Sequence, residues 1–210
     1  GIDFGLTPAA VFAQRLVTGR WLILDELVCF DMGVARFSEL LRGEIYKNYK
    51  PYEVMMYGDP AGDFRSQTDE RTPFQIMRTY GLKSRPAPTN DVALRIEAVD
   101  TALSRLLDGK PGFLLDTKCI NLKKGFNGGY HYRRIQTSGD RYDEKPLKNR
   151  YSHVHDALQY LLMGAGEGRT LLSGKHQNQP TIVNKDWDVF AKQKSKRKVK
   201  KIWDIFKKNG

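Results

Sequence analysis

The hydrophobic pattern of the first thirty residues predicts three strands. Ile2 and Phe4 share one face of a short run and Asp3 lies on the other, which is the two-residue period of a strand. Runs rich in β-forming residues follow at 9–16 and 21–30, and turn residues separate them. Strands joined by such short turns pair antiparallel, so this part of the chain is expected to form a three-stranded meander.

Helices and strands are then expected to alternate. Apolar residues spaced three and four positions apart predict helices, and short runs bounded by glycine or proline predict strands. The expected elements are a helix from Phe37 to Ile45, a strand at 53–57, a short helix at 73–80, a short strand or extended link at 82–88, a helix from Thr89 to Gly109, a strand at 113–115, a possible hairpin arm at 130–135 and a helix from Ser152 to Met163. The apolar stripe of the 89–109 helix is expected to consist of Val92, Ile96, Val99, Leu103 and Leu106. The whole predicts an α/β fold with a mixed five-stranded sheet, three antiparallel strands followed by parallel ones, flanked by helices.

Composition limits the number of domains and points to an anionic partner. The chain has 210 residues, 40% of them hydrophobic, which is enough for one globular core. We expect a folded domain at 1–168 and a basic flexible tail at 169–210. The net charge is +11, and residues 183–210 alone carry ten Lys or Arg against three Asp. A surplus of this kind favours a nucleic acid as partner.

Other features of the sequence exclude several classes of protein. Two cysteines are too few for a disulfide framework or a zinc cluster, so reduced thiols are expected. No apolar run approaches the roughly 18 residues of a membrane span, and no secretory signal is recognisable, so no membrane partner is expected. The chain opens with Gly1 inside a strand-like run, which we interpret as the start of a fragment of a longer protein.

Three aspartates are placed where they can meet. Asp3 lies in the first strand, Asp59 follows the fourth, and Asp156 lies on the last helix. If the first and fourth strands are parallel neighbours, their carboxylates approach one another and the packed helix supplies the third. Carboxylates crowded together need a cation, and hard oxygen ligands suit Mg²⁺ or Mn²⁺. Two such ions roughly 4 Å apart are a known device for phosphodiester hydrolysis.

The segments around these aspartates resemble a known family. Gly1-Ile2-Asp3-Phe4-Gly5, Gly58-Asp59-Pro60-Ala61-Gly62 and Ser152-His153-Val154-His155-Asp156-Ala157-Leu158 are similar to motifs of the nuclease domain of tailed-bacteriophage terminase large subunits. The resemblance spans about residues 1–165. It implies a ribonuclease H-like fold, with Asp3, Asp59 and Asp156 as the metal-binding catalytic triad.

The resemblance also implies a biological setting. Such a domain is a metal-dependent endonuclease that cleaves concatemeric viral double-stranded DNA during genome packaging, in the cytoplasm of the infected bacterial host. An ATPase domain precedes it in the full-length protein, and the portal and the small terminase subunit are its partners. No GxxxxGK[ST] motif follows a strand here, so no ATPase activity is expected of this chain.

Further residues are candidates for the same site. Asp63 is a possible additional metal ligand in the loop after Asp59. The candidate DNA contacts are Arg65, Arg71, Lys123, Lys124, Arg133, Arg134 and, next to the third aspartate, His155. Each Lys or Arg that contacts a phosphate adds salt-sensitive affinity. For His153 a capping or surface role is expected.

Three other functions stay open at this point. A transposase or junction resolvase of the same fold would use the same metal chemistry. The run Gly-Ile-Asp-Phe-Gly also resembles the phosphate-binding opening of sugar kinases and actin-like ATPases, although Asn127-Gly128-Gly129 lacks the acid of their second loop. A DNA-binding module without catalysis would explain the charge but not Asp3.

Overall fold

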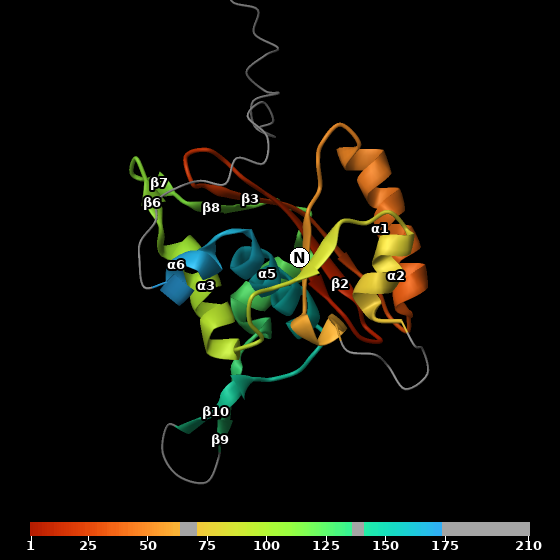
Figure 1. Ribbon diagram of the computed structural model, residues 1–210. Coiled ribbons are helices and arrows are strands. Elements are labelled where there is room, and N and C mark those ends of the chain that lie inside the picture. Colours follow the sequence, from red (N-terminus) through yellow and green to blue (C-terminus); the bar gives the residue numbers. More distant parts are fainter. Residues whose placement is uncertain (64–70, 136–140, 174–210) are drawn as a thin grey trace, which may run out of the picture.

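The computed structural model describes residues 1–63, 71–135 and 141–173, and its centre is a six-stranded sheet with helices on both faces (Figure 1). The strands lie in the order β5-β4-β1-β2-β3-β8. Their bounds are Ile2–Asp3 (β1), Ala9–Arg15 (β2), Trp21–Val28 (β3), Met56–Gly58 (β4), Ser84–Pro86 (β5) and Phe113–Leu115 (β8).

The pairing of these strands confirms the expected ribonuclease H-like arrangement. β1, β2 and β3 form an antiparallel meander, while β4 adds parallel to β1 and β5 adds parallel to β4. The sheet has one strand more than expected, because β5, left open as a short strand or extended link at 82–88, also joins it. β8 pairs parallel with β3 at the opposite edge.

The helices and the smaller strands complete the described fold. The helical segments are α1 (Val34–Tyr49), η1 (Pro60–Asp63), α2 (Pro73–Thr79), α3 (Val92–Ser104), α4 (Ile120–Lys124), η2 (Gly125–Gly129), α5 (Ser152–Ala165) and α6 (Glu167–Ser173). Two hairpins lie outside the main sheet: β6 (Leu106–Leu107) with β7 (Lys110–Pro111), and β9 (Tyr132–Ile135) with β10 (Arg141–Pro146). The second hairpin projects from the body as an arm (Figure 1). None of the helices in the described ranges combines the length and the apolar character needed to cross a membrane.

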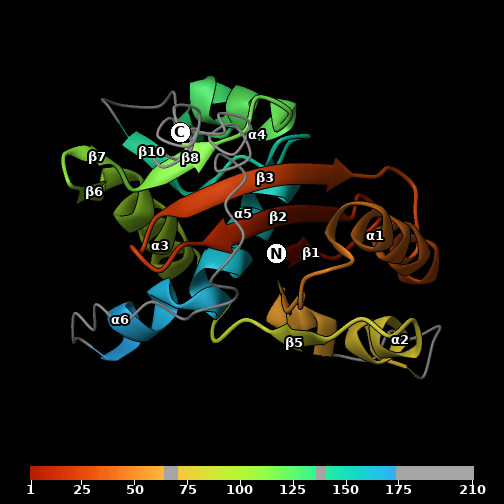
Figure 2. The same cartoon turned by 90° about the horizontal axis from the view of Figure 1, so that it is seen from above.

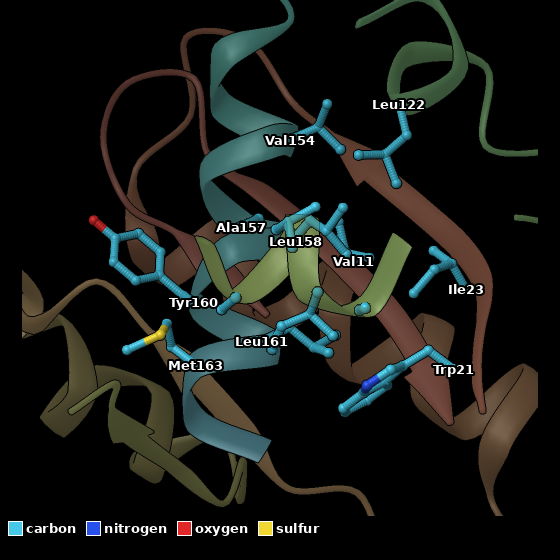
Figure 3. Packing of buried hydrophobic residues seen from close by; sticks show 14 of the residues in the cluster. Val11, Trp21, Ile23, Leu122, Val154, Ala157, Leu158, Tyr160, Leu161 and Met163 are labelled. Atoms are coloured by element: carbon cyan, nitrogen blue, oxygen red, sulfur yellow. The ribbon is translucent and has the colours of Figure 1, made fainter. Parts of the chain in front are cut away.

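Two apolar clusters hold the helices to the sheet. On one face, Phe37 and Leu41 of α1 pack with Ile2 of β1. On the other face, α5 supplies more residues of the larger cluster than any other element, and α3 and α6 lie beside it (Figures 1 and 2). Figure 3 shows Leu158 and Leu161 of α5 directed toward the sheet residues of this cluster. The continuous burial of α5 confirms the expectation of a largely buried helix.

The contact between α5 and β1 is unusually close and fixes where α5 lies. A Cβ atom on Gly1 would lie 1.9 Å from the backbone oxygen of Ala157 and 2.6 Å from Cβ of Leu161. Only glycine allows this approach. Because Gly1 and Asp3 face the same side of the strand, the close contact brings Asp3 against the first turns of α5.

The predicted buried face of α3 was wrong. The helix ends at Ser104 rather than near Gly109, and Leu103 is largely exposed. The residues that α3 buries are Arg95, Ala98, Val99 and Ala102. Two alanines let α3 approach α5 closely, and Arg95 is buried because it pairs with a carboxylate on that helix. An apolar periodicity cannot reveal an arginine that turns inward.

The residues at which the sequence predicts these two helices to begin do not cap them. Asp91, not Thr89 or Asn90, caps α3, and its carboxylate accepts a hydrogen bond from the backbone N–H of Leu94. At the start of α5 the Ser152 hydroxyl donates to the backbone oxygen of Asn149 instead of capping the helix.

Helix α6 is attached to the body through Glu167. Its side chain is 1% exposed and accepts two hydrogen bonds from Arg105, at 2.9 and 2.7 Å, and one from Nε1 of Trp21 at 2.8 Å. Leu171 packs on the larger cluster, so helical structure continues past residue 168, where the tail was expected to begin. Residues 174–210 of the expected tail lie outside the described residues.

Candidate functional site

The parallel pairing of β1 and β4 places Asp3 next to Asp59. Ile2 is paired with Gly58, and the backbone N–H of Asp59 donates to the oxygen of Ile2 at 3.1 Å. The next residues in register are the two aspartates. Tyr57 packs against Gly164 of α5, so the alternation of the strand directs Asp59 toward the face that α5 covers.

Asp156 reaches the same place from α5. Asp3 is 5% exposed and Asp156 is 3% exposed, so both carboxylates are held away from water. The pKa of Asp3 is raised to about 6. Burial is the main cause, the hydrogen bond with His153 opposes it, and the nearby charge of Asp156 adds to it. Two buried carboxylates with like charges repel each other, which favours a bound cation.

Three basic side chains surround the buried pair. Nδ1 of His153 lies 2.9 Å from Oδ2 of Asp3. Nη1 of Arg95 lies 3.4 Å from Oδ1 of Asp156, and the ammonium of Lys148 contacts Oδ2 of Asp156. These groups hold the carboxylates in place, and Arg95 and Lys148 supply positive charge against Asp156.

Tyr160 of α5 lies near the aspartates and contacts Arg95. Its hydroxyl donates to Oδ1 of Asn90 at 2.7 Å, and its ring lies 4.4 Å from the Arg95 guanidinium. Burial raises the pKa of Tyr160, Arg95 lowers it, and the charges of Asp59, Asp3 and Asp156 each raise it. The Tyr160 hydroxyl is thus within electrostatic reach of all three carboxylates, and Figure 3 shows it directed away from the apolar cluster.

Asp59 is engaged differently from the other two aspartates. It is half-buried, and its Oδ1 accepts a hydrogen bond from the backbone N–H of Ala61 at 2.8 Å, which fixes the turn into η1. Within the described ranges, no three His, Cys, Asp or Glu side chains are grouped closely enough to hold a metal ion as they stand. That Asp3, Asp59 and Asp156 converge on one cation stays a prediction.

The donor set nevertheless fits Mg²⁺ or Mn²⁺. All three side chains are carboxylates, which are the ligands that these hard cations prefer. Asp3 and Asp156 are already fixed and buried, and the counter-charge nearest to solvent is the ammonium of Lys148, whose side chain is 71% exposed. A divalent ion would need only this mobile side chain to move and the Asp59 carboxylate to turn.

The other predicted residues are spread over three surfaces. Asp63 is exposed at the end of η1, and Arg71 is exposed just before Thr72, which caps α2. Arg65 lies outside the described residues. Lys123 and Lys124 are exposed on α4, while Arg133 and Arg134 are exposed on the arm. Nε of Arg133 pairs with Oδ2 of Asp143 at 2.9 Å within that hairpin.

His155 does not reach the surface. It is 3% exposed, and its ring stacks on Tyr130 and meets the edge of Phe126. Nε2 lies 3.2 Å from the backbone oxygen of Leu122, and burial lowers the pKa of His155 to about 4. In this position the ring packs η2 against α5 and has no access to a phosphate.

The sequence analysis missed His153, Lys148 and Arg95 as members of the site. One signal for His153 was present, since it precedes Asp156 by three residues and so lies on the same face of a helix. Arg95 and Lys148 come from a helix and a loop whose relation to Asp156 depends on the tertiary fold. Their contact with the carboxylate has no local signature.

The strand order, with Asp3 at the end of β1, Asp59 after β4 and Asp156 on α5, is that of the expected ribonuclease H-like fold. No protein-family model matches the chain, and no curated protein matches it in sequence. Among solved structures, the chain is similar to the nuclease domain of g2p, the large terminase of bacteriophage SPP1, determined with bound Mn. The two are 15% identical, the match covers 76% of this chain and 81% of that one, and the TM-score is 0.49. That domain is of the same class as the family that the three sequence motifs resemble.

Proposed function

We propose that this chain is a divalent-metal-dependent DNA endonuclease, a hydrolase in which Asp3, Asp59 and Asp156 hold two Mg²⁺ or Mn²⁺ ions. One observation carries the proposal: Asp3 and Asp156 are buried together, although they come from a strand and a helix about 150 residues apart in sequence. Burying two carboxylates side by side is unfavourable unless a cation compensates for it. Arg95 and Lys148 pair with Asp156, whereas the pKa of Asp3 is still raised to about 6, which supports a cation as an additional ligand.

The residues of the chain have distinct tasks in this proposal. His153 orients Asp3, and Arg95 fixes Asp156 from within the core. When bound, the metal would supply Lewis-acid activation of water and stabilise the leaving oxygen of the phosphodiester. Exposed Lys123, Lys124, Arg133 and Arg134 would contact the DNA backbone, with Arg71 on the side of α2.

The biological setting follows from the motif resemblance and is part of the same proposal. The substrate would be concatemeric double-stranded viral DNA, cut during genome packaging in the cytoplasm of an infected bacterium. The partners would be an ATPase domain of the same polypeptide, the portal and the small terminase subunit.

A missing acid disfavours a kinase-like or actin-like alternative. Gly125–Gly129 forms the π-helical turn η2, where a Cβ atom on Gly129 would lie 2.7 Å from the Tyr151 ring and one on Gly125 would meet His155. These two glycines pack η2 onto α5, while Asn127 and Gly128 between them are exposed, so what counts against this alternative is the missing acid in Asn127-Gly128-Gly129.

A nicking assay tests the proposal. Supercoiled plasmid is incubated with the protein and Mn²⁺, Mg²⁺ or EDTA, and Asp3→Asn, Asp59→Asn and Asp156→Asn are compared with Asp100→Asn, a change on the exposed side of α3. We expect metal-dependent nicking by the wild type and Asp100→Asn, and a loss of at least about 100-fold in the three site variants. A plasmid that is shifted on a gel but never cut would identify a binding module instead.

A second substrate distinguishes a terminase nuclease from a junction resolvase. A four-way DNA junction cut much faster than linear duplex would favour a junction resolvase of the same fold. Equal or faster cutting of linear duplex supports the packaging role.

A further inference from the structure

An open groove of about 490 Å³ lies along β5, the strand at one border of the sheet. β4 occupies one side of β5, and within the described ranges no strand pairs with its other side. Figure 2 shows β5 at the outer border of the ribbon, with α2 beside it. The residues that line the groove include Met55, Arg78, Leu82, Lys83, Ser84 and Arg85.

The open side of β5 presents backbone groups to the groove. The backbone N–H of Met56 donates to the oxygen of Lys83 at 2.9 Å, which turns the Lys83 carbonyl toward β4. Alternate residues of a strand turn their backbone groups to the same neighbour, so Ser84 turns its N–H and C=O to the open edge. Pro86 follows two residues later and has no N–H to offer. The open edge is therefore short, and a partner strand can pair with it over only a few residues.

Basic side chains surround this edge. Lys83 and Arg85 are exposed on one face of β5, and Arg78 is exposed in the last turn of α2. Arg42 of α1 adds a further charge nearby, since its guanidinium lies 5.8 Å from the centre of the Tyr80 ring, at the end of α2. Charge complementarity therefore favours an acidic partner.

The two cations on β5 are available to such a partner. Nζ of Lys83 pairs with Oε1 of Glu53 at 2.8 Å, and both side chains are exposed. Exposed pairs contribute little to stability, so another carboxylate can replace Glu53 easily. Nη2 of Arg85 donates to the Tyr57 hydroxyl at 2.6 Å, and the guanidinium lies 4.7 Å from the centre of that ring. This contact orients Arg85 and leaves it further N–H donors for a carboxylate.

Apolar side chains form the floor between these charges. Leu82 is buried and packs with Met77 of α2. Met55 is 41% exposed, and the register of β4 and β5 places it opposite Lys83. A DNA backbone would match the charges but neither the apolar floor nor the open strand edge. An extended peptide can match all three, because it has amides for the edge, carboxylates for the cations and apolar side chains for the floor.

We propose that the groove along β5 binds an extended peptide of a partner protein in which acidic and apolar residues alternate. The peptide adds to the sheet as a strand, as in other cases of β-augmentation. Lys83 and Arg85 are two residues apart and share one face, so the acidic residues of the peptide lie on that face. The apolar residue between them lies opposite Ser84, exchanges backbone hydrogen bonds with it, and faces the side of Leu82 and α2.

Peptide binding to the whole chain tests the proposal. The probe is a fluorescent acetyl-Glu-Val-Asp-Val-Glu amide. One control peptide has the same composition in the order Val-Val-Asp-Glu-Glu, and the other is the probe with both valines N-methylated, which removes the donors to Ser84. We expect the probe to bind at least about tenfold more tightly than either control, and to slow exchange of the Ser84 amide by about tenfold.

A pair of charge reversals tests the surface itself. Lys83→Glu removes one attraction and adds one repulsion, so it should weaken binding of the probe by about tenfold. Lys110→Glu makes the same change of net charge on the exposed hairpin strand β7 and is the matched control. It should change the affinity by less than about twofold.

Three results would overturn the proposal. The first is a probe that binds no more tightly than its N-methylated form, and the second is unchanged exchange of the Ser84 amide with the probe at saturation. The third is a Lys83→Glu protein that loses affinity for duplex DNA but not for the probe, which would assign the groove to the DNA backbone. These readouts are binding and exchange, so the outcome does not depend on the proposed nuclease activity.

Discussion

The ammonium of Lys148 contacts the carboxylate of Asp156 and joins an exposed cation to a buried anion. The side chain of Lys148 is 71% exposed and that of Asp156 is 5% exposed. Arg95, on the other oxygen of the same carboxylate, is itself buried. The lysine can therefore move away from Asp156 at little energetic cost while the arginine stays. Lys148 is thus a replaceable counter-ion for the site.

Removing Lys148 is expected to strengthen metal binding. An exposed ion pair contributes about 0.2–1 kcal/mol, so Lys148→Met should tighten Mn²⁺ binding by up to about fivefold, measured by calorimetry at neutral pH. Lys145→Met, an exposed change on the arm, is the matched control and should leave the affinity unchanged. Weaker binding in Lys148→Met would show that the lysine assists the metal instead of competing with it.

The Glu167 carboxylate is expected to be essential for stability. Glu167→Ala leaves Arg105 and Arg15 without their buried partner, and breaking a buried pair in this way costs about 3–5 kcal/mol. The melting temperature should fall by roughly 10 °C. Glu167→Gln keeps the shape of the side chain and an acceptor for Trp21, so its melting temperature should fall less. A Glu167→Ala protein as stable as the wild type would show that α6 is not part of the folded unit.

Acid is expected to destabilise the fold through His155. Its pKa is lowered to about 4 in the folded protein, so below about pH 6.5 the unfolded chain binds a proton that the folded chain does not. The contribution of neutral His155 to the free energy of unfolding is fully present above pH 6.5 and is lost as pH falls toward 4. Between pH 7 and 5 this contribution amounts to about 2 kcal/mol, measured by urea unfolding at a series of pH values.

His155→Gln isolates that contribution, since glutamine can still donate to the oxygen of Leu122 but does not titrate. Asp3 acts with the opposite sign, because its raised pKa favours the folded state as pH falls through 6. We therefore compare the wild type with His155→Gln at each pH, because the contribution of Asp3 is the same in both and cancels. Equal pH dependence in both would contradict the buried, neutral state of His155.

The sheet was largely predictable from sequence because its signals are local. Alternation around Ile2 and the turn residues between the next two runs were enough to place β1, β2 and β3. The face of α3 was not predictable, since Arg95 turns inward to a partner 61 residues away. Apolar periodicity treats such a residue as solvent-facing.

Of the groups at the candidate site, the sequence pointed only to the carboxylates. Asp3 between two apolar neighbours is anomalous for a strand, and that anomaly is visible in the sequence. The compensating groups, Lys148 and Arg95, are ordinary exposed-type residues whose role depends on where the tertiary fold brings them. For His155 the sequence favoured a capping or surface role, with a phosphate contact as the alternative, but the ring is buried against Tyr130.

The central claim is that Asp3, Asp59 and Asp156 share divalent cations. The most direct measurement is the anomalous scattering of Mn²⁺ in crystals of the protein soaked with that ion. We expect one or two Mn²⁺ peaks between the three carboxylates, with Lys148 displaced from Asp156. No peak at this place under saturating Mn²⁺, with Lys148 still on Asp156, would contradict the account.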